Sequence, residues 1–133
     1  MGNSSLNDKE FIRVQKRIEK YRSERDEYDK LYHYRSELRN KMAVLCRQNK
    51  SQCEKHCFLI RKYLFEKGKI SFNKALREHN VIDNKLQQIT LKMTTDIELA
   101  ITAMEKCHLK NRFKNDLETL KSERDAFKSS HQE

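Results

Sequence analysis

Cysteine and histidine side chains gather in one short stretch of the chain. Cys46, Cys53, His56 and Cys57 fall within twelve residues, and both residue types bind zinc. A zinc site needs its ligands within about 2.0–2.3 Å of the metal, whereas Cys46 and Cys57 on one continuous helix lie roughly 16 Å apart along its axis. The paired Cys-x-x-Cys spacing is also missing. We therefore interpret these cysteines as small buried residues on a helix seam and predict no metal site.

Motifs typical of catalysis are absent from the sequence. It has neither a glycine-rich phosphate loop nor a nucleophile elbow. The histidines are scattered, and His79 falls on an apolar stripe, where a hydrogen-bonded core histidine is more common than a general base. We predict a protein that is not an enzyme and that takes no cofactor.

The start of the chain suggests lipid attachment. Gly2 follows Met1 and precedes small polar residues, as N-myristoylation requires. The usual pattern has Ser or Thr at position six, but Leu6 stands there and Ser5 comes one place early. One myristoyl chain anchors a protein only marginally, so a basic surface must supply a second membrane signal. We predict lipidation at Gly2 combined with such a surface.

Basic residues early in the chain provide this surface. Residues 1–69 hold 18 Lys and Arg against 10 Asp and Glu, whereas residues 70–133 hold 11 against 10. Each cation near an anionic leaflet contributes about 1 kcal/mol. The residues predicted to bind an anionic membrane surface are Lys9, Arg13, Lys16, Arg17 and Lys20.

Composition predicts the elements that position these residues. The chain has no Pro and two Gly, with 36% apolar and 37% charged residues. This mixture favours long helices that each bury one stripe. Apolar residues recur every three or four positions. The predicted fold class is all-α, an elongated helical hairpin of two long helices plus a short C-terminal helix.

The apolar phase also predicts the element boundaries. We expect a flexible N-terminus at 1–7, a helical hairpin over 8–110 with its turn near 48–52, and a C-terminal helix and tail at 111–133. We favour one second helix from about 53 to 107 over a break at Gly68, because the phase holds through that glycine. The seam predicted to pack on a partner helix or on further copies of the chain comprises Ile82, Leu86, Ile89, Met93 and Ile97.

No apolar run approaches the ~20 residues that span a bilayer, and the N-terminus lacks a signal-peptide core. These features predict a cytoplasmic protein that lies peripherally on endosomal or other internal membranes. Its four cysteines are then expected to be reduced.

Four stretches of the sequence resemble the ESCRT-III family, in particular its myristoylated subunits. These are Met1-Gly2-Asn3, the polar Asn7-Asp8-Lys9 before the first helix, the basic stretch from Cys46 to Leu64, and residues 81–89. The chain ends at 133 without the family's long acidic C-terminal region and without a helical motif for its disassembling ATPase. The resemblance implies membrane-bound filaments that act in endosomal sorting and membrane remodelling. Gly2 then carries the lipid, the basic first helix meets anionic lipid, and the second-helix seam takes neighbouring subunits.

Two other functions fit parts of the sequence. A coiled-coil scaffold or adaptor that binds only partner helices would use the apolar stripes and not Gly2. A basic nucleic-acid-binding hairpin would use Tyr21, Tyr28, Tyr32 and Tyr34, which interleave with cations. Nucleic acid is the less favoured partner, because three of these tyrosines lie on the helix seam and no known nucleic-acid-binding motif is present.

Overall fold

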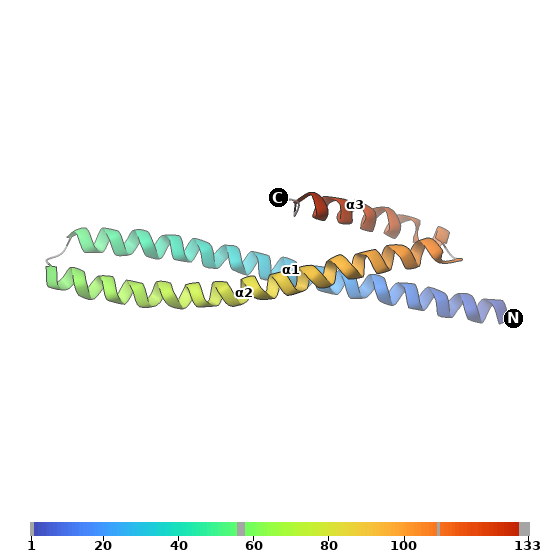
Figure 1. The fold of residues 1–133 in the computed structure, drawn as a ribbon, viewed down its shortest axis with the longest axis horizontal. Helices are drawn as coiled ribbons and strands as arrows, with labels where there is room; N and C mark the ends of the chain where they lie inside the picture. Colours follow the sequence, from blue (N-terminus) through green and yellow to red (C-terminus); the bar gives the residue numbers. More distant parts are fainter. Residues whose placement is uncertain (1, 56–57, 109, 131–133) are drawn as a thin grey trace. The chain divides into compact units, whose positions relative to one another are not determined.

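The protein is a hairpin of two long helices followed by a shorter C-terminal helix, as a computed structural model shows (Figure 1). This confirms the predicted all-α class; the described residues contain no strand. The structure describes residues 2–55, 58–108 and 110–130. The elements are α1 (Gly2–Lys55), α2 (Phe58–Lys106), the short 3-10 helix η1 (Lys110–Phe113) and α3 (Lys114–Ser130).

The predicted turn near 48–52 is wrong, because α1 continues through these residues to Lys55. The segment contains neither Gly nor Pro, and Gln and Lys are good helix formers, so its polar character alone does not end a helix. Helix α2 begins at Phe58, and residues 56–57 lie outside the described part. At the other end, α1 already begins at Gly2 instead of near residue 8.

Gly68 lies inside a continuous α2, as the apolar phase predicted. A Cβ built on Gly68 would stand 2.7 Å from both Cγ and Oδ1 of Asn49 on α1. Ordinary van der Waals contact begins near 3.4 Å, so a larger residue would force the two helices or the Asn49 side chain apart. The glycine therefore permits a close approach of α1 and α2 and does not break the helix.

The chain divides into two compact units. The first, here called the three-helix unit, contains Met1–Glu27 and Ile89–Glu133. The second, the hairpin unit, is Tyr28–Gln88. Helix α3 belongs to the first of these units.

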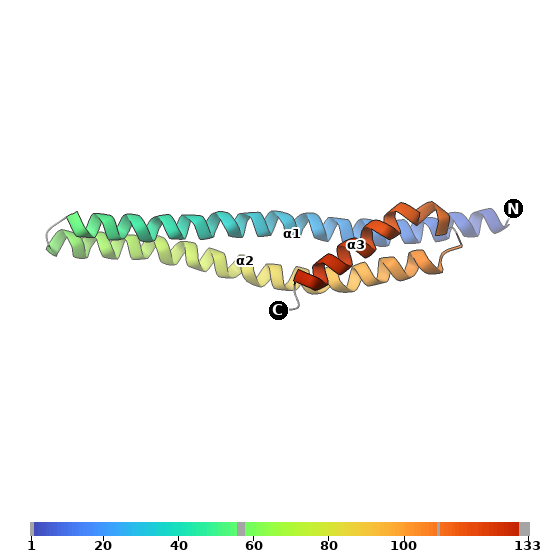
Figure 2. The ribbon, with the colours of Figure 1, turned by 90° about the horizontal axis from the view of Figure 1, so that it is seen from above.

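Helix α3 completes the core of the three-helix unit (Figure 2). The aromatic anchor just before α3 is Phe113 of η1, which is 1% exposed and stacks on Phe11 of α1 with 5.1 Å between ring centroids. Polar contacts add to this packing: Arg22 pairs with Asp116 at 2.6 Å, and Arg25 pairs with Glu123. The buried apolar residues of the unit are Val14, Ile18, Tyr21, Ile89, Met93, Ile97, Ala100, Ile101, Met104, Cys107, Phe113, Leu117 and Leu120.

The hairpin unit has a much thinner core. Leu38 of α1 packs against Ile82 and Leu86 of α2, with Tyr28 and Leu31 partly buried beside them. Ala75 is the further buried apolar residue in the described part of this unit. Two helices can cover only one stripe on each other, so most of their remaining surface faces solvent.

Polar contacts between α1 and α2 fix the register of the hairpin unit. Arg35 pairs with Asp83 at 2.7 Å, and its guanidinium lies 5.2 Å from the ring centroid of Tyr32. The Nε atom of Arg39 donates a hydrogen bond to Nε2 of His79 at 2.9 Å. His79 is hydrogen-bonded, but it is only half-buried, so its interpretation as a core histidine is not confirmed.

Candidate functional site

The five cations predicted to bind a membrane lie along one exposed face of α1 in the three-helix unit. With about 100° of rotation per residue, their spacing places them within an arc of roughly 100°. Val14 and Ile18, which are 3% and 0% exposed, point to the opposite side of the helix. We call this face the basic stripe; all of its residues are exposed: Lys9, Arg13, Lys16, Arg17 and Lys20.

Most of the basic stripe is not committed to partners within the chain. Lys20 lies 3.7 Å from Asp96 of α2, and its side chain is still 68% exposed. Among the described residues, no ion pair involves the other four cations. The stripe extends over roughly 16 Å of helix, so these charges can meet a flat anionic surface together.

Glu10 lies beside the basic stripe but is engaged elsewhere. Its carboxylate accepts a hydrogen bond from the backbone N–H of His108 at 3.1 Å, just after α2 ends. This backbone hydrogen bond, with further contacts from His108 and Cys107, lowers the pKa of Glu10. The negative charge is therefore directed toward the end of α2 and away from the stripe.

A carboxylate pair lies at the end of the basic stripe. Burial and the neighbouring Asp96 carboxylate raise the pKa of Glu24 to about 7, although Lys20 and Lys92 oppose the shift. One oxygen of Glu24, Oε2, is buried without a hydrogen-bond partner. A proton shared by this pair relieves the repulsion between two carboxylates, which makes Glu24 sensitive to pH near neutrality.

The predicted partner-helix seam is already covered by the chain's own helices. Ile82 and Leu86 pack on Leu38 of α1 within the hairpin unit. Ile89, Met93 and Ile97 are buried in the three-helix unit, each at most 6% exposed. Packing of this seam on a helix of a partner or of a further copy stays a prediction. Within this chain, the seam residues are covered by α1 and α3.

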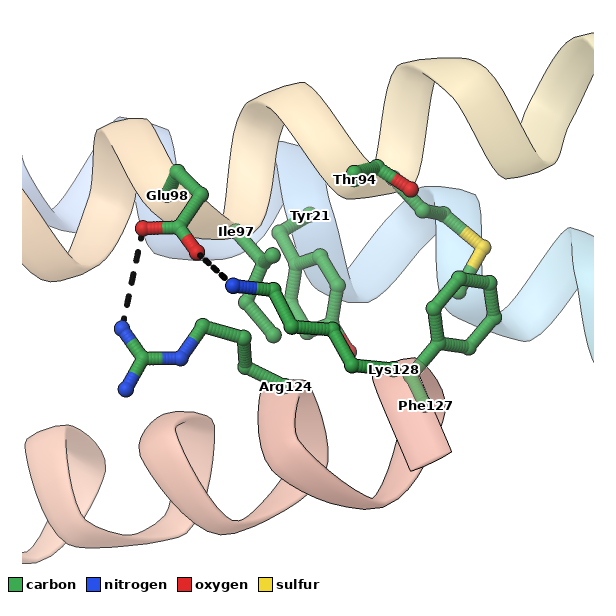
Figure 3. Close-up of a pocket in the computed structure, with 8 residues that line it drawn as sticks. Tyr21, Thr94, Ile97, Glu98, Arg124, Phe127 and Lys128 are labelled. Atoms are coloured by element: carbon green, nitrogen blue, oxygen red, sulfur yellow. Dashed lines mark ion pairs between the residues drawn. The ribbon is translucent and has the colours of Figure 1, made fainter. Parts of the chain in front are cut away.

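A small cavity opens between the helices of the three-helix unit (Figure 3). At its rim, Glu98 of α2 pairs with Arg124 at 3.6 Å and with Lys128 at 3.3 Å. It has room for about one water molecule, whereas ligand pockets usually measure ~300–1,000 Å³. We interpret it as a packing gap, with a lining that includes Tyr21, Met93, Ile97 and Phe127.

The structure describes only part of the predicted chemistry of the cysteines and Gly2. Cys46 is exposed, which corrects its interpretation as a buried seam residue, because Leu45 and Asn49 occupy the half-buried positions of that turn. His56 and Cys57 lie outside the described residues, as does the Cys53 side chain. Among the described residues, no group of three or more Cys, His, Asp and Glu could hold a metal ion.

The backbone of Gly2 begins α1, and its surroundings are not described.

Large apolar side chains are exposed near the start of α2, in the hairpin unit. Leu59, Tyr63 and Ile70 are 78%, 66% and 68% exposed. Ile60 is also 47% exposed. The sequence interpretation missed this surface, although these three residues do stand off the buried phase of α2. In the part of the chain that is described, no helix is long and apolar enough to cross a bilayer.

Comparisons with known proteins found no similar protein. No family model matches the sequence, and neither a curated protein nor a solved structure matches it.

Proposed function

We propose that this chain is a non-enzymatic helical protein that binds anionic membrane surfaces through the basic stripe. The observation that carries the proposal is the exposure of five cations on one face of α1, opposite the buried core of the three-helix unit. At about 1 kcal/mol per cation near an anionic leaflet, the stripe supplies about 5 kcal/mol at low salt. Such binding is reversible and depends on ionic strength.

A lipid on Gly2 would strengthen this contact. A myristoyl chain alone gives marginal anchoring, and a basic patch is the kind of second signal that makes it stable. Gly2 stands seven residues before Lys9, the first cation of the stripe. The resemblance to the ESCRT-III family extends the proposal to a peripheral protein that polymerises on endosomal membranes during sorting or remodelling. Since α1 and α3 cover the α2 seam, assembly would use other surfaces of the chain.

Nucleic acid is a second candidate partner, since the same cations can neutralise phosphates. Base stacking gains little support from the tyrosines. Tyr21 is 3% exposed and its hydroxyl donates to Glu123 at 3.0 Å, so its ring is not available to a base. The hydroxyl of Tyr34 donates to Glu78 across the hairpin unit. A scaffold that binds only partner helices is supported less, because the long α2 seam is occupied within the chain.

Cosedimentation with vesicles tests the proposal. The probe is phosphatidylcholine vesicles with and without phosphatidylserine, at low salt, with fluorescent duplex DNA as a parallel arm. In the test variant, Lys9, Arg13, Lys16 and Arg17 are changed to Gln, and Lys20 is kept because it pairs with Asp96. Loss of four cations should cost about 4 kcal/mol, or roughly a thousand-fold in affinity for anionic vesicles.

A matched control removes the same charge elsewhere. Lys41, Lys85, Lys106 and Lys114 are exposed cations outside the stripe, and their change to Gln should weaken vesicle binding by less than about tenfold. Equal losses of vesicle affinity in the two variants would show that only net charge matters, and would refute the stripe as the binding site. Binding to DNA but not to anionic vesicles would show that the partner is nucleic acid and not a membrane.

A further inference from the structure

We propose that the outer face of α2 between Leu59 and Ile70 inserts its apolar side chains into the headgroup region of an anionic bilayer. This gives the hairpin unit a membrane contact of its own, and it rests on the proposed function for its choice of ligand. The observations that carry it are the exposure of large apolar residues, their common face and the cations around them.

The apolar residues form a line along α2. Leu59, Tyr63 and Ile70 fall within an arc of roughly 40° when each residue turns the helix by about 100°. Each of them is at least 66% exposed. The residues that face α1 lie on the other side of the helix, where Ala75 is 2% exposed and Leu64 is half-buried. The line therefore points away from the hairpin seam and has no cover among the described residues.

Charges next to the line determine what can cover it. Between Leu59 and Lys74 the sequence has five cations and one acid, Glu66. Lys62, Lys67 and Lys69 are all exposed. Apolar and aromatic residues with lysines at their flanks are typical of a helix that lies in the membrane interface, where the chain's lysines reach lipid phosphates.

A second copy of the chain is a poorer occupant of this face. A self-contact would bring identical Lys-rich flanks together, with Glu66 as the only acid between Leu59 and Lys74 to offset them. Like charges that meet at an interface oppose binding. An anionic bilayer instead pairs each lysine with an opposite charge and also receives the apolar side chains. Charge complementarity thus selects the membrane.

The chain contains no Trp, so a single introduced tryptophan reports on its own surroundings. In Tyr63→Trp, anionic vesicles should shift the emission to shorter wavelength, and lipids brominated on their acyl chains should quench it. Leu91→Trp serves as the matched control, since Leu91 is a 72% exposed residue of the same helix in the three-helix unit. Its emission should move much less and resist quenching.

A second variant measures how much this face contributes to binding. Changing Leu59, Tyr63 and Ile70 to Ser removes exposed side chains and should leave the helical circular dichroism unchanged. Affinity for anionic vesicles should fall about tenfold or more. The sedimentation coefficient of the free protein should not change, because the face is not used between copies.

The outcomes separate this inference from the proposed function. If the protein sediments with anionic vesicles but Tyr63→Trp keeps its emission and escapes quenching, the inference fails and the basic stripe stands. If the variant with a neutralised basic stripe still binds and is quenched at position 63, the inference stands and the stripe fails. A dimer that dissociates when the three residues become Ser would assign this face to a second copy and overturn the inference.

Discussion

The two units of the chain use the same two long helices but differ in how much of them is covered. In the described part of the three-helix unit, thirteen apolar residues are buried and three large ones are exposed. In the described part of the hairpin unit, four apolar residues are buried and nine large ones are exposed. The difference follows η1 and α3, which belong to the first unit and supply Phe113, Leu117 and Leu120 to its core.

Ion pairs between helices follow the same division. The three-helix unit has such pairs at all three helix contacts, for example Lys20 with Asp96, Arg22 with Asp116 and Lys121 with Glu105. In the hairpin unit, Arg35 with Asp83 is the ion pair between the described parts of α1 and α2. We infer that the three-helix unit provides most of the stability and that the hairpin unit provides surface.

The largest expected effect tests this division through two phenylalanines. Phe113→Ala should lower the free energy of unfolding by about 3–5 kcal/mol, because it leaves a cavity in a closed core and removes the stack on Phe11. Phe65 in the hairpin unit is 51% exposed, so Phe65→Ala should cost less than about 0.5 kcal/mol. Urea denaturation followed by circular dichroism measures both. Similar costs for the two variants would mean that the units share stability evenly.

The second effect concerns the contact between Gly68 and Asn49 in the hairpin unit. Gly68→Ala should gain about 1 kcal/mol of helix propensity but lose more, because the new Cβ meets Asn49 at 2.7 Å. In an Asn49→Ala background the clash is removed, and the same change should become stabilising. The four free energies of unfolding should give a coupling of about 2 kcal/mol. A Gly68→Ala change that stabilises both backgrounds equally would show that the two helices do not approach closely there.

The fold was readable from the sequence because it depends on periodicity. Apolar spacing of three and four residues identified both long helices and the seam through Ile82, Leu86 and Ile97, and phase continuity correctly carried α2 past Gly68. The turn was misplaced because the polar residues 48–52 contain no Gly or Pro, and polarity without a helix breaker does not stop a helix. Periodicity also cannot say which helix covers a stripe, so it could not show that α1 and α3 of the same chain cover this seam.

Only part of the candidate site could be predicted from the sequence. The basic stripe follows from a spacing that any helical wheel displays. The exposed apolar face around Tyr63 depends on the absence of α3 from the hairpin unit, which is a tertiary fact. The raised pKa of Glu24 is equally hidden, because Glu24 and Asp96 stand far apart in the sequence and meet only when α1 and α2 pack.

The third effect is a pH dependence confined to the three-helix unit. The pKa of Glu24 is raised to about 7 from an ordinary value of 4.5, mainly by burial and then by Asp96. The folded state then binds this proton more tightly than the unfolded state, so the stabilisation is complete below pH 4.5 and is lost as the pH rises through 7. After allowance for solvent screening, the loss should be about 1 kcal/mol. Glu24→Gln, which cannot titrate, should lack this component.

The measurement is the difference in the free energy of unfolding between the parent protein and Glu24→Gln at several pH values. Other groups titrate in both proteins and cancel in that difference. Asp125→Asn is a suitable control, since Asp125 is an exposed acid of the same unit. A flat difference between pH 4.5 and 7 for Glu24→Gln would show that Glu24 titrates normally and is not coupled to Asp96.

The smallest effect compares one ion pair from each unit. Lys121 and Glu105 lie 2.9 Å apart with side chains 42% and 44% exposed, and a double-mutant cycle to Ala should give about 0.5 kcal/mol or less. Arg35 and Asp83 lie 2.7 Å apart with side chains 18% and 36% exposed, and their cycle should give about 1 kcal/mol, since lower exposure reduces screening. If the more exposed pair, Lys121 with Glu105, gave the larger coupling energy, burial would not explain the difference between the two pairs. The ion pairs of the three-helix unit would then contribute to its stability alongside its apolar core, whereas the small expected value leaves most of that stability to the core.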